Sequence, residues 1–241
     1  MADKKSWILG MLALSLLLAG LIQAAPTAAL PADGPARIET DRPLVALTFD
    51  DGPRRSTTTD LLDGLAQRGV KGTFFLVGEM IPGNEDLVRR MDEEGHQIGT
   101  HSYDHVYLTG LNAADFSRQV SRTETLLQDI LGHGGFALRP PYGMIDNGVE
   151  KRTGSPLILW SVDPEDWDDK NTDRIVEHIV AQVRDGDVIL LHDIYPTSVE
   201  AALRVVDELH RQGYLFVTVE ELAHQRHAEL KPGETYRCFY P

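Results

Sequence analysis

The chain has 241 residues, a formal net charge of −14 and 42% hydrophobic residues. A chain this acidic is repelled by a phosphate backbone, which excludes nucleic acid as a partner. Its single cysteine, Cys238, excludes an internal disulfide framework, so a hydrophobic core must hold the fold alone.

The N-terminal segment is typical of a secretory signal. Residues 1–25 combine Lys4 and Lys5 with an apolar run and small residues. An uncleaved anchor is the alternative, although the run is short of the roughly 20 residues that a spanning helix needs. We therefore expect an exported bacterial protein of the periplasm, cell envelope or extracellular space, which touches a membrane only if this segment is retained.

The rest of the chain divides by composition. Residues 26–43 are rich in Pro and Ala and are predicted to be a linker. Residues 44–225 are long enough for one domain with a good core, and residues 226–241 are set apart as a C-terminal tail. The sequence carries no signal for the oligomeric state.

Short apolar segments alternate with amphipathic ones along this domain. The apolar segments predict strands at 44–49, 73–77, 97–100, 136–138, 157–162, 188–191 and 215–219. The amphipathic segments predict helices at 56–68, 84–95, 112–132, 172–186 and 198–213, with Ser, Thr or Asn as caps and Gly as terminators. Repeated strand–helix units predict a parallel sheet, and seven of them favour a closed (β/α) barrel over an open doubly wound sheet.

Ionisable residues follow five of the predicted strands. They are Asp50 and Asp51, His101 and His105, Arg139, Asp163 and Asp166 with Trp167 beside them, and His192 and Asp193. In such barrels the C-terminal ends of the strands share one mouth, so we expect these side chains to converge there.

A metal site is the first chemistry that this cluster suggests. His101 and His105 are four residues apart and can point one way on a helical turn or a tight loop. With a carboxylate they form a His₂Asp set that suits zinc, iron, cobalt and other divalent ions. The remaining six histidines are expected to be exposed to solvent: His96, His133, His178, His210, His224 and His227.

Acid–base catalysis is the second kind of chemistry that this cluster of ionisable residues suggests. Two adjacent carboxylates can divide roles, one binding a metal while the other acts as a base, provided that Gly52 and Pro53 bend the chain after Asp50. Arg139 is suited to orient the free carboxylate and lower its pKa. His192 is the natural general acid, with Asp166 or Asp163 as the carboxylate that keeps it charged.

Five motifs, "TFDDGP", "HSYDH", "RPPYG", "DPEDW" and "LLHD", occur in the order typical of one family. The chain from about Leu44 to Leu222 resembles the polysaccharide deacetylases, the NodB-type domains of carbohydrate esterase family 4. The resemblance implies a distorted (β/α) barrel with fewer or less regular units than eight. The stretch around His192 is most similar to the peptidoglycan N-acetylglucosamine deacetylase branch.

The resemblance also implies a role for each motif residue. Asp50 would be the general base, held by Arg139, and His192 the general acid, tuned by Asp166. One divalent ion, zinc first with cobalt or another ion as the alternative, would be bound by Asp51, His101 and His105. The backbone N–H of Tyr142 would donate to the oxyanion, and Trp167 and Leu190 would line the acetyl pocket.

The expected activity is removal of N-acetyl groups from N-acetylglucosamine in a cell-envelope polysaccharide, peptidoglycan or a chitin-like oligomer. An esterase that removes O-acetyl groups, for example from xylan, would use the same residues. A non-catalytic glycan-binding domain is disfavoured because the base, the acid and all three ligands occur together. An iron(II) oxygenase is disfavoured because that chemistry usually sits on a different, all-β fold.

Overall fold

The computed structural model describes residues 37–241, so the predicted signal peptide or anchor and most of the predicted linker lie outside the described residues. The strands are β1 (Leu44–Asp50), β2 (Thr73–Leu76), β3 (Gln97–Thr100), β4 (Leu157–Ile158), β5 (Val188–His192), β6 (Leu215–Val217) and β7 (Thr235–Tyr236). The helices are α1 (Arg55–Arg68), α2 (Glu85–Glu93), α3 (Ala113–Leu131), α4 (Asn147–Arg152), α5 (Thr172–Gln182), α6 (Pro196–Arg211) and α7 (Val219–Gln225). Within residues 37–241, no helix is long and apolar enough to cross a membrane.

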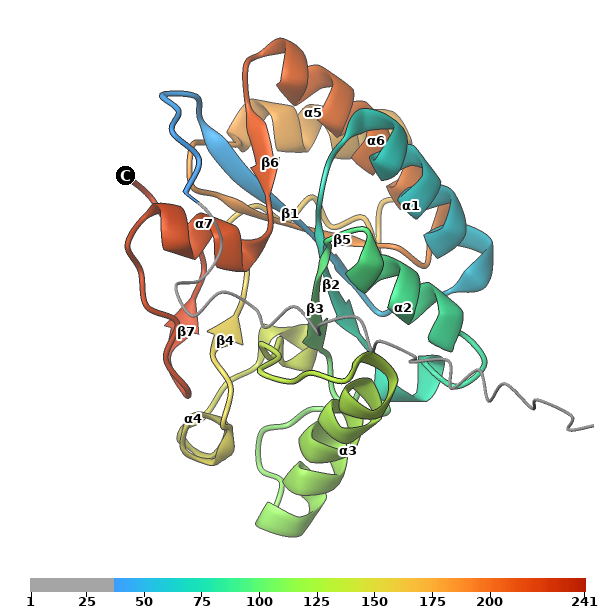
Figure 1. The fold of residues 1–241 in the computed structure, drawn as a ribbon, viewed down its shortest axis with the longest axis vertical. Helices are drawn as coiled ribbons and strands as arrows, with labels where there is room; N and C mark the ends of the chain where they lie inside the picture. The colour runs from blue at the N-terminus through green and yellow to red at the C-terminus, as the bar shows by residue number, and fades with distance from the viewer. Residues whose placement is uncertain (1–36) are drawn as a thin grey trace, which may run out of the picture. The chain divides into compact units, whose positions relative to one another are not determined.

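The sheet is parallel and centred on β1. Its order is β3-β2-β1-β5, and β6 pairs with the first residues of β1. Single parallel bridges join Thr100 to Leu138, Leu138 to Leu157 and Val162 to Ile189, and thereby connect β3 back to β5. The sheet thus closes into an irregular ring (Figure 1), which confirms the predicted α/β fold of the distorted barrel type.

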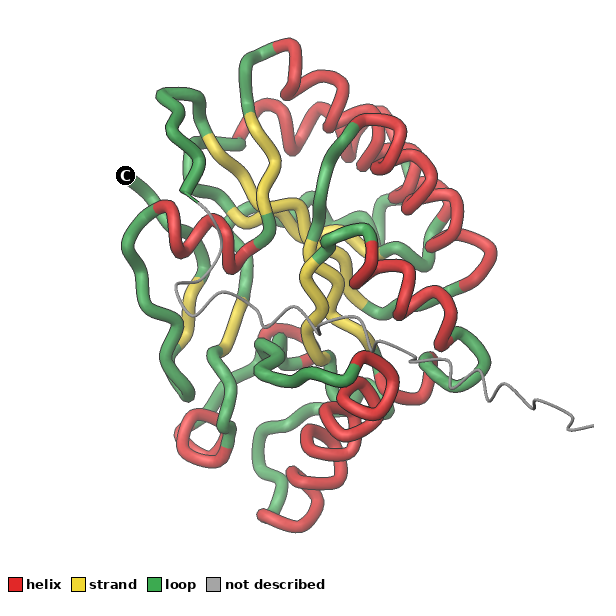
Figure 2. Tube along the Cα trace, in the orientation of Figure 1, coloured by secondary structure: helices red, strands yellow, loops and turns green. Residues whose placement is uncertain are grey.

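Helices cover the outer face of the sheet. Helices α5, α6, α1 and α2 lie side by side on one side of it, and α3 continues the series beside α2 (Figures 1 and 2). In β1, Val45, Leu47 and Phe49 face these helices, while Leu44 and Ala46 pack with the core inside the ring. Because side chains alternate along a strand, the inward row continues to Asp50 at the C-terminal end of β1.

Two of the expected strands, 136–138 and 157–162, keep only a small part of the predicted pairing. The 136–138 segment contributes only the bridge residue Leu138. In the 157–162 segment, Leu159 donates its N–H to Tyr236, whereas the N–H groups of Ser161 and Val162 both bond the carbonyl of Val188. The segment therefore changes partner from β7 to β5 through a bulge, which interrupts regular pairing.

The expected strand 215–219 ends at Val217, because the next residues begin a helix that the sequence analysis missed. Thr218 and Glu221 form a capping box at the start of α7. Helix α4 and strand β7 were also not predicted. Of the predicted caps, Asn112 does cap α3, but the Asn84 side chain donates to the carbonyl of Met80 and no side chain caps α1.

The C-terminal segment 226–241 packs on the barrel. Strand β7 pairs with β4, and the N–H of Phe239 bonds the carbonyl of Gly186 at 2.7 Å. Gly186 has φ 97°, and a Cβ there would lie 2.2 Å from the Phe239 carbonyl oxygen, so only glycine permits this approach. Phe239 is buried and stacks on Tyr236.

Replacement of Phe239 by Ala is expected to destabilise the protein by about 3–5 kcal/mol, because it removes a buried aromatic ring and leaves a cavity. Chemical denaturation measures this change. Arg237→Ala is the matched control on the same segment, since Arg237 is exposed, and it is expected to stay within about 0.5 kcal/mol of the wild type. Equal, small effects of both substitutions would show that the segment does not contribute to the core.

Candidate active site

The C-terminal ends of the strands bring the predicted residues together. The pairing of β1 with β5 places Asp50 opposite His192. Thr100 and Leu138 form a parallel bridge, so the residues that follow them, His101 and Arg139, leave the ring next to each other. Five loops that are distant in sequence therefore meet at one rim, as the sequence analysis predicts.

Asp50 is fixed by a buried arginine. Arg139 is fully buried and donates from Nη1 to Asp50 Oδ1 at 2.7 Å and to Thr48 Oγ1 at 2.8 Å. Its other donors reach the carbonyls of Ile158 and Leu159, and the guanidinium lies 4.0 Å from the ring centre of Phe75. Burial lowers the pKa of Arg139, and the opposing charge of Asp50 favours its cationic form. Asp50 is thus an oriented carboxylate with one oxygen committed to Arg139.

Asp51 points into the same space by a local backbone turn. Its φ of 74° is left-handed, so the bend that separates the two carboxylates lies at Asp51 itself, one residue before the predicted Gly52-Pro53. Gly52 is required there for another reason: a Cβ would lie 2.4 Å from the carboxylate of Asp193.

Asp51, His101 and His105 form the predicted cluster. One ligand atom from each residue lies within 4.8 Å of the others. Asp51 Oδ1 is 3.6 Å from His101 Nε2 and 3.3 Å from His105 Nε2. This oxygen is buried and has no hydrogen-bond partner among the described residues. A buried, unpaired carboxylate oxygen that faces two imidazole nitrogens fits a cation held between them.

The imidazole of His101 is prepared for this role. Its Nδ1 lies 2.6 Å from the carbonyl oxygen of Arg139, so Nδ1 carries the proton and Nε2 presents its lone pair. Burial lowers the pKa of His101, which favours the neutral form that binds metals. Arg139 therefore orients Asp50 with its side chain and the candidate ligand His101 with its backbone carbonyl.

The loop that carries both histidines is held by α3, which the sequence analysis did not anticipate. Gln119 Oε1 accepts the N–H groups of Tyr103 at 3.1 Å and Asp104 at 3.2 Å. The loop needs this support because Ser102 and His105 have left-handed φ values of 63° and 54°. Gln119 lies within α3 and belongs to none of the five motifs, so the sequence carried no clear signal for its role.

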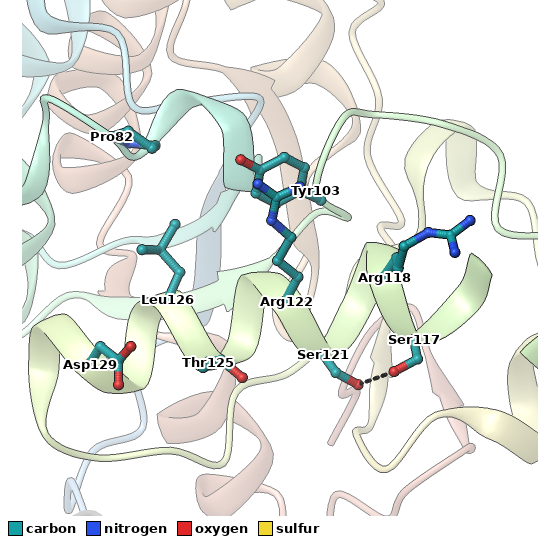
Figure 3. Close-up of a pocket in the computed structure, with 9 residues that line it drawn as sticks. All are labelled: Pro82, Tyr103, Ser117, Arg118, Ser121, Arg122, Thr125, Leu126 and Asp129. Atoms are coloured by element: carbon teal, nitrogen blue, oxygen red, sulfur yellow. Dashed lines mark hydrogen bonds between the residues drawn. The ribbon is translucent and has the colours of Figure 1, made fainter. Parts of the chain in front are cut away.

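A cavity of about 600 Å³ lies against the same helix (Figure 3). Arg122 points over the ring of Tyr103 at 3.5 Å from its centre. No predicted site residue lines this cavity; its lining residues are Pro82, Tyr103, Ser117, Arg118, Ser121, Arg122, Thr125, Leu126 and Asp129. Tyr103 is the residue of the histidine loop that lines it.

His192 is paired with Asp166. Its Nδ1 lies 2.7 Å from Asp166 Oδ1, and its backbone N–H donates to Asp166 Oδ2 at 2.9 Å. Of the two predicted partners Asp166 is therefore the correct one, while Asp163 accepts the N–H of Glu165. Burial opposes the charged imidazole, but the hydrogen bond and charge of Asp166, together with Asp50 and Asp51, raise the pKa of His192 to about 9.

The three predicted substrate residues occupy different environments. Tyr142 and Trp167 are about half exposed on the rim, at 51% and 52%. Leu190 is buried in β5, two residues before His192, and so belongs to the same inward row. Tyr142 has a left-handed φ of 61° and donates its hydroxyl to the carbonyl of His105 at 3.2 Å.

Two other polar residues depart from expectation. His96, predicted to be exposed, is buried: its Nδ1 accepts the N–H of Gly72 at 2.9 Å and its ring meets Phe74 edge-on. Asp193, for which no role was assigned, is buried and accepts the Thr58 hydroxyl. Burial raises the pKa of Asp193 to about 7. Its place directly after His192 in the last motif was the available signal.

Comparison with known proteins agrees with this geometry. Residues 37–155 match the family described as polysaccharide deacetylase. A peptidoglycan-N-acetylglucosamine deacetylase of Listeria monocytogenes is 40% identical over 192 residues, covering 80% of this chain and 41% of that protein. One of Bacillus cereus is 36% identical over 207 residues, covering 79% of this chain and 92% of that protein. A solved family 4 acetyl xylan esterase from Clostridium thermocellum, in complex with a cobalt ion, has a TM-score of 0.77 at 29% identity, covering 81% of this chain and 98% of the other.

The fold and the site define an α/β barrel with an Asp-His-His candidate metal centre. The chain belongs to the polysaccharide deacetylase family, as the five motifs predict. It spans about two fifths of the length of the Listeria relative, 41%. The candidate centre is consistent with the divalent metal of that family.

His101→Ala and His105→Ala are each expected to lower the affinity for zinc or cobalt at least 100-fold, because each removes one of three ligands. Titration of metal-free protein against a competing chelator measures the affinity. The control is His133→Ala, a surface histidine paired with Asp92, which should bind metal like the wild type; His96 is unsuitable because it is buried. Retention of wild-type affinity by both ligand variants would rule out the Asp51-His101-His105 centre.

Proposed function

We propose that this protein is a metal-dependent N-deacetylase that hydrolyses the acetamido group of N-acetylglucosamine units in a cell-envelope polysaccharide, with peptidoglycan as the first substrate. One observation carries the proposal: an oriented carboxylate, a His₂Asp centre and a charged histidine meet at one rim. The names of the Listeria and Bacillus relatives support the substrate. The signal-like residues 1–25 support export to the periplasm, envelope or medium, where such polymers lie.

The proposed reaction breaks the amide C–N bond of the acetamido group and forms a C–O bond from water. A divalent ion held by Asp51, His101 and His105, zinc by preference, would supply Lewis acidity and lower the pKa of water at this centre. Asp50 accepts the proton of the attacking water, and Arg139 holds its carboxylate in position through the hydrogen bond to Oδ1. The backbone N–H of Tyr142 donates to the negative charge that develops on the acetyl carbonyl oxygen, an interaction of about 3 kcal/mol.

His192 completes the reaction. Its Nδ1 is committed to Asp166, so Nε2 is the nitrogen that delivers a proton to the departing sugar amine. Acetate and the free amine are the products, and the proton gained by Asp50 balances the one that His192 gives up. Trp167 and Leu190 are proposed to line the pocket for the acetyl methyl group. This group is apolar, so apolar side chains suit its pocket.

O-acetyl esterase activity is the second candidate, favoured by the likeness to the acetyl xylan esterase. The same residues would act on an ester, whose alcohol leaves more readily than an amine. The deciding experiment measures acetate release from peptidoglycan, N-acetylglucosamine oligomers and acetylated xylan. Release from the first two supports the proposal, and release from xylan alone replaces it with the esterase. Absence of release from any of them, with metal bound, would favour a glycan-binding domain.

Asp50→Asn is expected to lower kcat at least 100-fold while metal affinity stays unchanged, because Asp50 is proposed as the base and not as a ligand. Asp51→Asn is the matched variant on the adjacent residue and is expected to lose metal affinity. Chelator titration and acetate release, measured on both proteins, separate the two roles. If Asp50→Asn lost the metal and Asp51→Asn retained it, the two assignments would have to be exchanged.

The dependence of activity on pH reports the protonation of the proposed general acid, His192. Since His192 must be protonated and its pKa is raised to about 9, activity should persist through neutral pH and fall as the pH rises through about 9. Asp166→Asn removes the main favourable charge, so the alkaline limb should move to lower pH, toward the ordinary value for histidine of about 6.5. Asp163→Asn, in the same motif, should leave it in place. An unchanged limb in Asp166→Asn would exclude His192 as the titrating acid.

A further inference from the structure

Tyr103 stands between the two histidines of the candidate metal centre. It is the third residue of "HSYDH" and is neither a proposed ligand nor a proposed catalytic group. Its side chain is partly buried and lines the cavity beside α3 (Figure 3), whereas the candidate ligands do not. The contacts of this ring are therefore with the structure behind the histidine loop.

The ring of Tyr103 packs against two neighbours. Gly78 opens the 3₁₀ turn Gly78–Met80, and a Cβ there would lie 2.5 Å from Cδ2 of Tyr103 and 2.6 Å from Oγ1 of Thr123. The guanidinium of Arg122, from α3, lies 3.5 Å from the ring centre (Figure 3). The ring thus occupies the space that a side chain at Gly78 would need, and only glycine permits this close approach.

The backbone of Tyr103 is fixed from the same two elements. Its N–H donates to Gln119 Oε1 of α3 at 3.1 Å, and its carbonyl accepts the N–H of Glu79 at 2.7 Å. The preceding carbonyl, that of Ser102, accepts the N–H of Gly78 at 3.0 Å. Ring and backbone together therefore attach the middle of the histidine loop to α3 and to the 3₁₀ turn.

His105 depends on this attachment more than His101 does. His101 directly follows β3, donates its N–H to the carbonyl of Leu76 at 2.8 Å and bonds the carbonyl of Arg139 through its ring. His105 comes four residues later, and its side chain is 31% exposed, against 3% for His101. The place of His105 in the centre is therefore set by the course of residues 102–104.

That course is strained. Ser102 and His105 have left-handed φ values of 63° and 54°, which cost a residue other than glycine about 1–3 kcal/mol each. Such conformations persist only where the surrounding structure enforces them. Tyr103 lies between these two residues, so its packing is the contact best placed to enforce both.

We infer that Tyr103 is a positioning residue for His105: its ring, packed against Gly78 and Arg122, sets the affinity of the centre for a divalent metal from outside the ligand set. The inference rests on the proposed function only in taking Asp51, His101 and His105 as the metal centre. It does not depend on which acetylated substrate is hydrolysed.

The test measures the affinity of metal-free variants for zinc and cobalt against a competing chelator. Tyr103→Ala is expected to lower the affinity about tenfold, because residues that orient a metal ligand typically contribute about 10- to 100-fold. Tyr103→Phe keeps the ring and should bind metal like the wild type. The matched control is Tyr240→Ala, which removes an exposed tyrosine bonded to Asp187 and should also leave the affinity unchanged.

A double variant separates positioning of His105 from general support of the fold. In His105→Ala the ligand that Tyr103 is inferred to position is absent, so adding Tyr103→Ala should cause no further loss of affinity. The same tenfold loss in both backgrounds would overturn the inference, because Tyr103 would then act on the centre without His105. Wild-type affinity in the single variant Tyr103→Ala would overturn it as well.

Gly78→Ala tests the same contact while every ligand and Tyr103 itself stay in place. The φ of Gly78 is not left-handed, so alanine brings no backbone strain there, but its Cβ must displace the ring of Tyr103. The affinity should fall as in Tyr103→Ala. Gly154→Ala is the control, since a Cβ at Gly154 meets nothing within 4 Å. Unchanged affinity in Gly78→Ala would overturn the inference even if Tyr103→Ala failed to fold.

Failure of the proposed function gives a different pattern of results. A wild type that binds zinc, loses affinity on Tyr103→Ala and releases no acetate supports the inference and refutes the proposed function. A wild type that releases acetate, and whose metal affinity is insensitive to Tyr103→Ala and Gly78→Ala, refutes the inference alone. A wild type without affinity for zinc or cobalt refutes both.

Discussion

The ion pair between Arg139 and Asp50 is the constraint on which the rest of the site depends. Both groups are buried, and removing one partner of such a pair typically costs about 3–5 kcal/mol, because the other charge is left without compensation. In the intact site the buried guanidinium is compensated by several partners. It donates hydrogen bonds to Asp50, Thr48 and two backbone carbonyls, and it stacks on Phe75. An arginine so fully committed can adopt one position, and it defines the geometry around it.

From that position the arginine connects three parts of the site. Its side chain fixes the carboxylate of Asp50, and its carbonyl fixes the ring of His101 in the tautomer that exposes Nε2. The parallel register then places His192 across from Asp50. The proposed base, a candidate metal ligand and the proposed acid are thus related through a single residue and one strand pairing, which explains how loops separated by more than half the chain hold a common geometry.

The site also contains backbone conformations that the sequence would not choose locally. Asp51, Ser102, His105 and Tyr142 all have left-handed φ values, although none is glycine. Such conformations persist only where neighbouring structure enforces them, and they concentrate at functional sites. Here the enforcement comes from α3 through Gln119 and Thr123, and from the packing of Asp193 against Gly52. The helices outside the ring therefore support the chemistry at its mouth.

The sequence by itself determined the alternation of strands and helices, the closed parallel architecture and most of the site. The signals for these features are the periodicity of apolar residues, the glycines that end helices and the five ordered motifs, and all of them can be recognised from neighbouring residues in the sequence. It did not determine which of Asp163 and Asp166 holds His192, that His96 is buried, or that residues 157–162 change partners through a bulge. Those outcomes depend on contacts between distant segments, in which the free energy of burial and hydrogen bonding outweighs local preference. Tertiary structure alone decided the support of the histidine loop by Gln119 and the packing of Tyr103 on Gly78, since neither pair has any relation in sequence spacing.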